Sequence, residues 1–440
     1  PHLLRGRRSL GGRFVFPTRP DVALSSADEP LGDERPAVRI HPARVLPPIP
    51  TRDHDMPSPT TARPSAPAPA PSVQGMSPGR LYNYSAGPGM MPEEVLKQIQ
   101  EDVWNCRNSG VGILEHSHRG PVYDRIIAEI DQDFREIGNI PKNYHILFMT
   151  GGSTSQNFIV PMNLLPADRS GVADYFNTGY WANQSIEHAR IFGHIHEAAS
   201  SRHTTYTFSP SAAETRFSQR PVYVHYTSNN TIYGTQHHDV PSIPSGAALV
   251  CDMCSDIFSR PFDVTRYGLI YASAQKNLGP AGTTVVIVRD DLVQAARSDI
   301  PVMFQYRTFV KGESRPNTPP AFPIYCVGVM LKWIKRQGGL AHFDKFNKEK
   351  AGIVYDAIDR SSFFKGHARA DSRSLMNITF RCPTPALDDL FVKEAEKEGL
   401  DCLRGHRVAG GMRASFYNAM PLGGAHALVQ FMREFERRHG

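Results

Sequence analysis

The chain has no long run of apolar residues and little cysteine. No window holds the roughly 18 uninterrupted apolar residues that a membrane-spanning helix needs, so we expect no integral membrane protein and no membrane partner. The six cysteines are scattered along 440 residues, which favours a reducing compartment over a disulfide-stabilised scaffold. A hydrophobic content of 40% and a charged content of 21% are those of an ordinary globular protein.

Lysine is absent from residues 1–80, although arginine is abundant there. This segment has eleven arginines and seven acidic residues, and it supplies +4 of the net charge of +6. The remaining residues are nearly neutral, whereas a nucleic-acid-binding surface needs basic residues gathered on a folded face. We therefore expect no nucleic-acid partner.

Residues 1–80 also carry 16 of the 36 prolines. Such a segment buries too little apolar area to offset the entropy of ordering, so we predict a disordered leader. Its first 20 residues hold five arginines and no acid, as organelle transit peptides do. Two other interpretations stay open: a leader without a targeting role, and an upstream extension of the coding sequence before Met76. The expected compartment is the cytoplasm, or a plastid or mitochondrion if residues 1–75 act as a transit peptide.

From Leu81 onward, short apolar runs alternate with stretches of helical spacing. Strand-like runs lie at 145–149 and 173–176, and further runs end at Cys251, Tyr271 and Val288. Short continuous apolar strands between helices predict a parallel α/β sheet that is buried on both faces. We predict a large α/β domain over 96–336 and a smaller α+β domain over 337–440, which the N-terminal segment 81–95 joins.

Lys276 is the most informative residue of the chain. It follows the apolar run 268–271 and precedes a turn at 279–282. A lone lysine is more often a surface residue with its ammonium in water. Asp252, however, ends another apolar run 24 residues upstream. A lysine that forms a Schiff base and an aspartate that faces a pyridinium nitrogen are the minimal pair for pyridoxal phosphate chemistry, so these two are the predicted catalytic residues.

Three further segments fit the same cofactor. The segment 151–154, Gly-Gly-Ser-Thr, lies between a predicted strand and a predicted helix, where small residues and a helix N-terminus suit a phosphate. Glycines after a strand are often only a turn, so this prediction depends on the lysine and the aspartate. Trp181 is either a core aromatic residue or a flat surface on which a pyridine ring stacks. Thr231 follows a strand and could hydrogen-bond the phenolic oxygen of the cofactor.

A third group of residues is cationic. It consists of two His-Arg pairs and one further arginine: His118, Arg119, His406, Arg407 and Arg413. Because a guanidinium matches carboxylates and phosphates with two parallel hydrogen bonds, the group suggests a substrate with a carboxylate and a second, doubly charged anion. The alternative is a set of solvated surface charges, which is the simpler interpretation without a structural anchor.

We predict no metal site. Cys251 and Cys254 have CxxC spacing, but no second CxxC or matched histidine pair accompanies them. Cys251 also falls within a predicted buried strand. The histidines at 116, 118, 237 and 238 lack a third ligand at metal spacing.

From Leu81 to Gly440 the chain resembles the phosphoserine aminotransferases, which are class V, fold-type I enzymes that use pyridoxal 5'-phosphate. The matching segments run along the whole globular length, and the last is highly specific within fold type I. They lie at 84–88, 115–119, 225–231, 274–282, 317–320 and 405–421. The resemblance implies a large domain with a mainly parallel seven-stranded sheet flanked by helices, and a smaller α+β C-terminal domain.

The resemblance also implies how the cofactor is held. Lys276 would form the Schiff base, and Asp252 would pair with the pyridinium nitrogen. Trp181 would stack on the ring, and Thr231 would contact its hydroxyl. The residues implied for the cofactor phosphate are Ser153, Thr154 and Gln275, with Asn317 and Thr318 from the neighbouring subunit of an obligatory homodimer. Some members of the family carry Gly-Arg at positions 153–154, so only fine contacts to the phosphate differ.

For the substrate, the resemblance assigns the cationic group. His118, Arg119, His406 and Arg407 would receive the substrate phosphate, some of them across the subunit interface, and Arg413 would bind the α-carboxylate. The implied reaction is reversible amino transfer between L-glutamate and 3-phosphohydroxypyruvate, giving 2-oxoglutarate and O-phospho-L-serine in serine biosynthesis. Whether 4-phosphohydroxythreonine is a second substrate stays open.

Another class V enzyme is the nearest alternative. An alanine–glyoxylate aminotransferase has no need for two His-Arg pairs. A cysteine desulfurase needs a reactive cysteine on a mobile loop, and none of the six cysteines has an obvious setting for that. A non-catalytic protein with a basic tether is the alternative from a different class, and the intact Lys276 and Asp252 argue against it.

Overall fold

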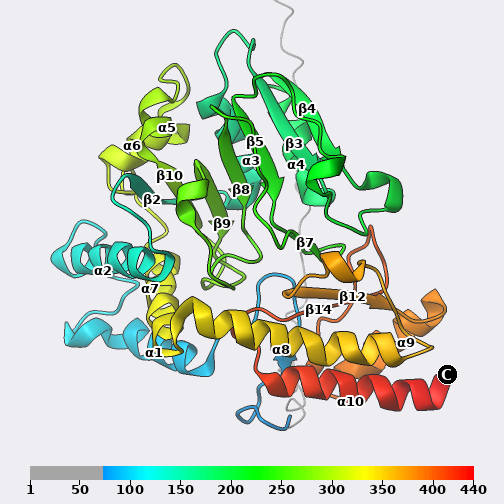
Figure 1. Ribbon diagram of the computed structural model, residues 1–440. Coiled ribbons are helices and arrows are strands. Elements are labelled where there is room, and N and C mark those ends of the chain that lie inside the picture. Colours follow the sequence, from blue (N-terminus) through cyan, green and yellow to red (C-terminus); the bar gives the residue numbers. More distant parts are fainter. Residues whose placement is uncertain (1–72) are drawn as a thin grey trace, which may run out of the picture. The chain divides into compact units, whose positions relative to one another are not determined.

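The computed structural model describes residues 73–440, which Figure 1 shows as a ribbon. Residues 1–72 of the predicted leader lie outside the described residues, and so does its possible targeting role. Its last part, 73–80, differs from the expected disorder: Val73 and Met76 pack on the core of the C-terminal domain, and the hydroxyl of Tyr82 donates to the carbonyl of Gln74 at 2.6 Å. In the described part, no helix is both long and apolar enough to cross a membrane.

A seven-stranded sheet forms the centre of the large domain (Figure 1). Its strand order is β2-β10-β9-β8-β5-β3-β4, and β10 alone runs antiparallel to its neighbours. The strands are β2 (Tyr144–Met149), β3 (Val172–Asn177), β4 (His194–Ser200), β5 (Tyr223–Thr227), β8 (Ala248–Asp252), β9 (Leu269–Ser273) and β10 (Thr284–Arg289). The mainly parallel seven-stranded sheet expected from the sequence is confirmed.

Both faces of this sheet are buried, which explains why its strands are apolar at successive positions. In β10, Val285 and Ile287 belong to one core cluster, whereas Val286 and Val288 belong to another on the opposite face. The first cluster also contains residues of α2 (Pro121–Gly138) and α7 (Ala321–Arg336). The second contains residues of α3 (Gly152–Leu164), α4 (Tyr180–Ala189), α5 (Asp290–Ala295) and α6 (Tyr306–Lys311).

The smaller domain has its own hydrophobic core. Its antiparallel sheet consists of β11 (Lys365–Gly366), β12 (Asn377–Arg381) and β14 (Met412–Ser415). Its helices are α8 (Gly339–Arg360), α9 (Pro385–Lys397) and α10 (Leu422–His439), and α8 and α10 lie side by side (Figure 1). The N-terminal strand β1 (Tyr82–Asn83) pairs in parallel with β13 (Leu400–Asp401), so this segment is built into the smaller domain. The helix α1 (Glu93–Asn105) instead contacts α7.

The carboxyl ends of β2, β5, β8 and β9 meet at one edge of the sheet, because these four strands run parallel. A short hairpin of β6 (Asn229–Asn230) and β7 (Thr235–Gln236) follows β5 at this edge. Ligands of open α/β sheets bind at the carboxyl ends of the strands. Apart from Asn317 and Thr318, which precede α7, the predicted cofactor residues lie on segments that leave the sheet here or on the adjoining helices.

Candidate active site

Lys276 lies in a tight turn directly after β9. The turn is closed by the Leu278 N–H, which donates to the carbonyl of Ala274 at 3.0 Å. The N-terminal segment passes against it, because the Gly89 N–H donates to the carbonyl of Gln275 at 2.7 Å. A Cβ atom added to Gly87 would lie 3.6 Å from the Lys276 side chain. The lysine is therefore confined between β9 and the residues that precede α1.

Asp252 is the last residue of β8 and is buried. Burial raises the pKa of its carboxyl group, while the hydrogen bond from the Cys254 N–H at 2.9 Å and the positive charge of Lys276 act in the opposite direction. A buried carboxylate of this kind gains stabilisation from a cationic N–H partner. A protonated pyridine nitrogen is such a partner, so Asp252 fits the predicted cofactor.

The segment 151–154 forms the N-terminus of α3, as predicted. Gly151 and Gly152 have φ of 91° and 65°, a region that favours glycine. No side chain of the N-cap residue occupies this helix end, so its first N–H groups other than that of Ser153 can donate to an anion. The Ser153 N–H donates to the Ser273 hydroxyl at 2.7 Å, and the Ser153 hydroxyl also contacts the Cys254 thiol. These contacts bring the ends of β8 and β9 and the start of α3 together, which suits a phosphate held by Ser153, Thr154 and Gln275.

Trp181 and Thr231 are in direct contact. The indole N–H of Trp181 donates to the Thr231 hydroxyl at 3.1 Å, so the tryptophan at the start of α4 is fixed to the tip of the β6–β7 hairpin. Trp181 keeps 36% of its surface exposed. An aromatic ring that is oriented on one edge and open to solvent can stack on a planar ligand.

Three of the five predicted cations gather beside Trp181. Arg413 on β14 donates to the carbonyl of Thr231 at 3.3 Å, and burial lowers the pKa of its guanidinium. The ring of His406 lies 5.6 Å from that of Tyr180, the neighbour of Trp181. Burial lowers the pKa of His406, and the positive charges of Arg413 and Arg407 add to this shift because both are close.

None of these three cations has a carboxylate partner among the ion pairs of residues 73–440. Arg404, close by in sequence, is instead paired with Asp389 at 2.5 Å. Arginines are normally compensated by acids when they are partly buried. An uncompensated cationic group next to a platform for an aromatic ring is suited to a ligand that carries anionic groups.

The other two predicted cations lie elsewhere in the same chain. His118 and Arg119 precede α2, and Asn317 and Thr318 precede α7; of these four, only His118 is not exposed. Arg315 ties the two segments together, because it donates to the carbonyl of His118 at 3.2 Å and pairs with Asp124. No hydrogen bond or ion pair of the described residues connects the four to the lysine or the aspartate.

The sequence reasoning missed two tyrosines that contact the predicted site or the segments around it. Tyr417 donates to the carbonyl of Ala86 at 2.6 Å, and its pKa is raised by burial but lowered by the charge of Lys276. Tyr180 packs between Trp181 and His406. Tyr417 lies in the matching segment 405–421 and Tyr180 is the neighbour of Trp181, but no local pattern distinguishes a tyrosine at a site from one in a core.

Comparisons with known proteins agree with this geometry. The family model for aminotransferase class V matches residues 81–428. The phosphoserine aminotransferase of Nitrosomonas europaea is 46% identical over 367 residues, which cover 82% of this chain and 99% of that protein. The solved phosphoserine aminotransferase from Bacillus circulans subsp. alkalophilus has a TM-score of 0.80 and 45% identity, with 82% of this chain and 99% of that chain covered.

A third comparison concerns a structure with bound cofactor. The phosphoserine aminotransferase of Trichomonas vaginalis, solved with pyridoxal phosphate, has a TM-score of 0.77 and 35% identity, and covers 80% of this chain and 100% of its own. The family predicted from the sequence is thus confirmed. The chain belongs to the class V aminotransferases and, among these pyridoxal-phosphate-dependent enzymes, to the phosphoserine aminotransferases.

Proposed function

We propose that this enzyme transfers an amino group reversibly between L-glutamate and 3-phosphohydroxypyruvate, giving 2-oxoglutarate and O-phospho-L-serine. The observation that carries the proposal is that Arg413 and Arg407 lack a carboxylate partner among the ion pairs of the described residues and lie next to His406, beside Trp181. A substrate with an α-carboxylate and a phosphate supplies the negative charges that this group lacks. An unphosphorylated acceptor such as glyoxylate leaves most of these charges unpaired, which argues against the alanine–glyoxylate alternative.

The cofactor residues divide into three groups. Lys276 and Asp252 would hold the reactive end and the ring nitrogen of pyridoxal phosphate, and Trp181 and Thr231 would hold its ring. The residues proposed for its phosphate in this chain are Ser153, Thr154 and Gln275. When bound, pyridoxal phosphate supplies an aromatic ring that accepts electrons from the substrate Cα.

The protein's own part in the reaction is binding and proton transfer. Arg413 would orient the substrate by its α-carboxylate, and His406 with Arg407 would bind the phosphate. The Lys276 amine would then take the proton from the substrate Cα and deliver it again as a general acid. Asp252 would keep a proton on the ring nitrogen throughout, because a buried carboxylate stabilises its cationic partner.

A panel of amino acceptors tests this function. With glutamate as donor, 3-phosphohydroxypyruvate should exceed hydroxypyruvate and glyoxylate in kcat/KM by at least about 100-fold, since each charge-assisted contact to the phosphate contributes roughly 1.5–3 kcal/mol. Equal use of glyoxylate would contradict the proposal. Replacing glutamate by 4-phosphohydroxythreonine as the amino donor in the same assay decides whether that compound is a second substrate.

We further propose a homodimer with shared active sites. His118, Arg119, Asn317 and Thr318 would reach the site of the partner subunit. Two observations support this: three of the four are exposed without a hydrogen bond or ion pair to their own lysine, and the same region carries exposed apolar side chains. Trp104 is 86% exposed and Leu114 61%, and patches of this kind commonly mark interfaces.

Mixing two inactive variants tests the shared site. Lys276→Ala removes the proton-transfer group and Arg119→Ala removes a phosphate ligand that the partner is proposed to supply. In a mixed dimer, one site would regain both intact residues, so unfolding and refolding the two variants together should restore about a quarter of the parent activity. Failure to gain any activity while mixed dimers form would show that Arg119 does not act across the interface.

A further inference from the structure

Two buried amides lie opposite each other at the base of the β6–β7 hairpin. Asn229 and Gln236, which we call the amide pair, are register partners in this hairpin. They are only 2% and 1% exposed. Neither belongs to the proposed cofactor or substrate residues, and an apolar pair would fill the same space without the cost of burying polar groups.

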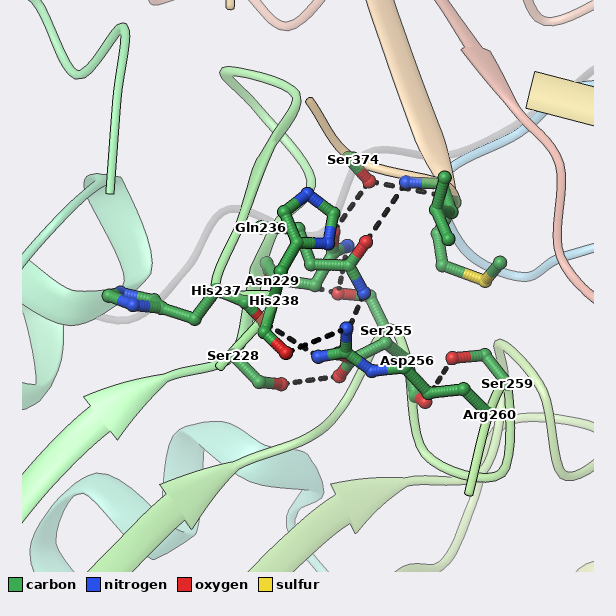
Figure 2. A network of polar contacts seen from close by, with 12 residues as sticks. Ser228, Asn229, Gln236, His237, His238, Ser255, Asp256, Ser259, Arg260 and Ser374 are labelled. Carbon is green, nitrogen blue, oxygen red and sulfur yellow. Dashed lines mark hydrogen bonds and ion pairs between the residues drawn. The ribbon is translucent and has the colours of Figure 1, made fainter. Parts of the chain in front are cut away.

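Asn229 connects the two domains. Its amide nitrogen donates to the hydroxyl of Ser255 at 2.8 Å, and its amide oxygen accepts from the hydroxyl of Ser374 at 2.5 Å (Figure 2). Ser255 lies three residues after Asp252 in the large domain. Ser374 lies three residues before the smaller domain's strand β12. The same amide nitrogen also donates to Asn377, the first residue of β12, at 2.8 Å.

Gln236 makes a second connection beside the first. Its amide nitrogen donates to the carboxylate of Asp256 at 3.1 Å, which also accepts from Ser228 (Figure 2). Its amide oxygen accepts from the Leu375 N–H at 3.0 Å. The amide pair thus links two successive residues after β8 with two successive residues before β12. Hydrogen bonds are directional, so they fix relative orientation more narrowly than apolar packing does.

In the smaller domain, the residues that the amide pair bonds lie at β12, the strand next to the one that carries Arg413. The strand β12 pairs with β14, with Asn377 opposite Ser415 and Thr379 opposite Arg413. The tip of the hairpin is held to the same strands, because Thr379 donates to the carbonyl of Tyr233 at 3.0 Å and Arg413 donates to that of Thr231. The hairpin tip and β12 are closely packed, because a Cβ atom on Gly234 would lie 2.6 Å from the Thr379 hydroxyl.

From these contacts we infer that the amide pair consists of positioning residues that fix Arg413 relative to Asp252 and the cofactor site. The inference rests on the proposed role of Arg413 in binding the substrate α-carboxylate. The amide pair touches no substrate. It acts by holding β12 and β14 in register with the end of β8, so that a carboxylate bound at Arg413 places the reacting Cα over the cofactor. A misplacement of about 1 Å can cost roughly 100-fold in rate.

Two substitutions test the inference in the cofactor-loaded enzyme. Asn229→Ala and the nearly isosteric Gln236→Met should each lower kcat/KM for glutamate and for phosphoserine by a similar factor of about 10, because both substrates carry the α-carboxylate. The affinity for pyridoxal phosphate, measured by absorbance titration, should stay at the parent value. Retained kcat/KM in both variants would overturn the inference.

Matched controls separate positioning from a general loss of packing. Asn163→Ala and Gln156→Met remove buried amides whose bonds stay within the large domain, to Phe304 and Tyr306 respectively. These controls should be destabilised to a similar degree in thermal unfolding and keep the parent kcat/KM. An equal loss of activity in the controls would show that the amide pair has only a structural role.

A double-mutant cycle with Arg413→Ala identifies the target of the amide pair. If the pair acts through Arg413, Asn229→Ala should change kcat/KM for glutamate less than about twofold once Arg413 is gone. Fully additive losses would overturn the inference and leave the proposed function intact. An Arg413→Ala enzyme with parent activity towards glutamate would instead contradict the proposed role of Arg413, and with it the inference.

Discussion

Single residues of the site owe their properties to the neutral groups around them. Asp252 is buried, which raises the pKa of its carboxyl group, and one backbone N–H from Cys254 supports its charge. Arg413 is supported by one backbone carbonyl and lacks an acidic partner among the described residues. Arg413 is therefore positioned without being neutralised, which leaves its charge available to a ligand, whereas Asp252 has the charge of Lys276 nearby.

Replacing Asp252 tests the first of these charges. Asp252→Asn keeps the shape of the side chain and its hydrogen bond from Cys254 but cannot compensate a positive ring nitrogen. We expect the loaded enzyme to lose about 10²-fold or more in the rate of proton removal from glutamate, measured by stopped-flow absorbance, while the cofactor stays bound. A parent rate in this variant would mean that another group faces the ring nitrogen.

Replacing Arg407 tests substrate choice. Arg407→Ala should lower kcat/KM for phosphoserine by about 10–100-fold and change that for glutamate little, because only phosphoserine carries the phosphate. The matched control is Arg404→Ala, three residues away, whose side chain is already paired with Asp389. An equal effect on both substrates would show that Arg407 does not recognise the phosphate.

At the scale of elements, β5 carries buried polar residues through the middle of the sheet. His225 is wholly buried and its ring nitrogen shares a hydrogen bond with the Tyr271 hydroxyl at 2.9 Å. Burial lowers the pKa of His225 to about 3. Its ordinary value is about 6.5, so the native state keeps this histidine neutral where the unfolded chain binds a proton.

This difference predicts a pH dependence of stability. Because the pKa of His225 is depressed in the native state, its contribution to stability is complete above about pH 6.5 and falls as the pH drops towards 3. Between pH 7.5 and 5.5 the loss due to His225 should be about 1 kcal/mol. His237 is buried with a similarly lowered pKa, so urea unfolding at the two pH values measures the contribution of His225 only by comparison with a variant that lacks it.

In the variant His225→Gln, the free energy of unfolding should change less between the two pH values, by the amount that His225 contributes. This holds even if the variant is less stable at both. The control is His203→Gln, which removes an exposed histidine and should keep the parent difference. An unchanged pH dependence in His225→Gln would mean that His225 is protonated in the native state.

At the scale of the whole molecule, every proposed site residue lies between 118 and 413. A protein that begins at residue 73 should therefore keep the parent kcat/KM. One that begins at 81 loses the packing of Val73 and Met76 and the Ser77–Glu93 hydrogen bond, and should be less stable by about 1–3 kcal/mol in thermal unfolding. Equal stability of the two proteins would show that 73–80 contributes nothing to the smaller domain.

The targeting role of residues 1–75 calls for a separate measurement. The expected compartment is the cytoplasm unless residues 1–75 act as a transit peptide, a role that suits their first 20 residues, which hold five arginines and no acid. A fluorescent reporter fused to 1–75 should then be imported into a plastid or mitochondrion. A diffuse cytosolic signal would contradict this and leave the leader without a targeting role.

Much of the fold and the cofactor site could be predicted because the signals are local. Lys276, Asp252 and the segment 151–154 each follow an apolar strand, and parallel strands bring their ends to one edge. The cationic group stays a prediction: Arg413 contacts Thr231 and His406 packs on Tyr180, both beside Trp181, whereas His118 has no such contact within its own chain. The composition of 1–80 also predicted disorder for the whole segment, although residues 73–80 contact the smaller domain.

The sequence by itself determined the fold class and the family, since strand periodicity and motif spacing depend on neighbouring residues. Only the tertiary structure decided which arginines share a site and that Asn229 and Gln236 join the two domains. The physical reason is the distance along the chain: Asn229 meets Ser374 across 145 residues. Such hydrogen bonds depend on how the two domains pack, and no local pattern of residues encodes them.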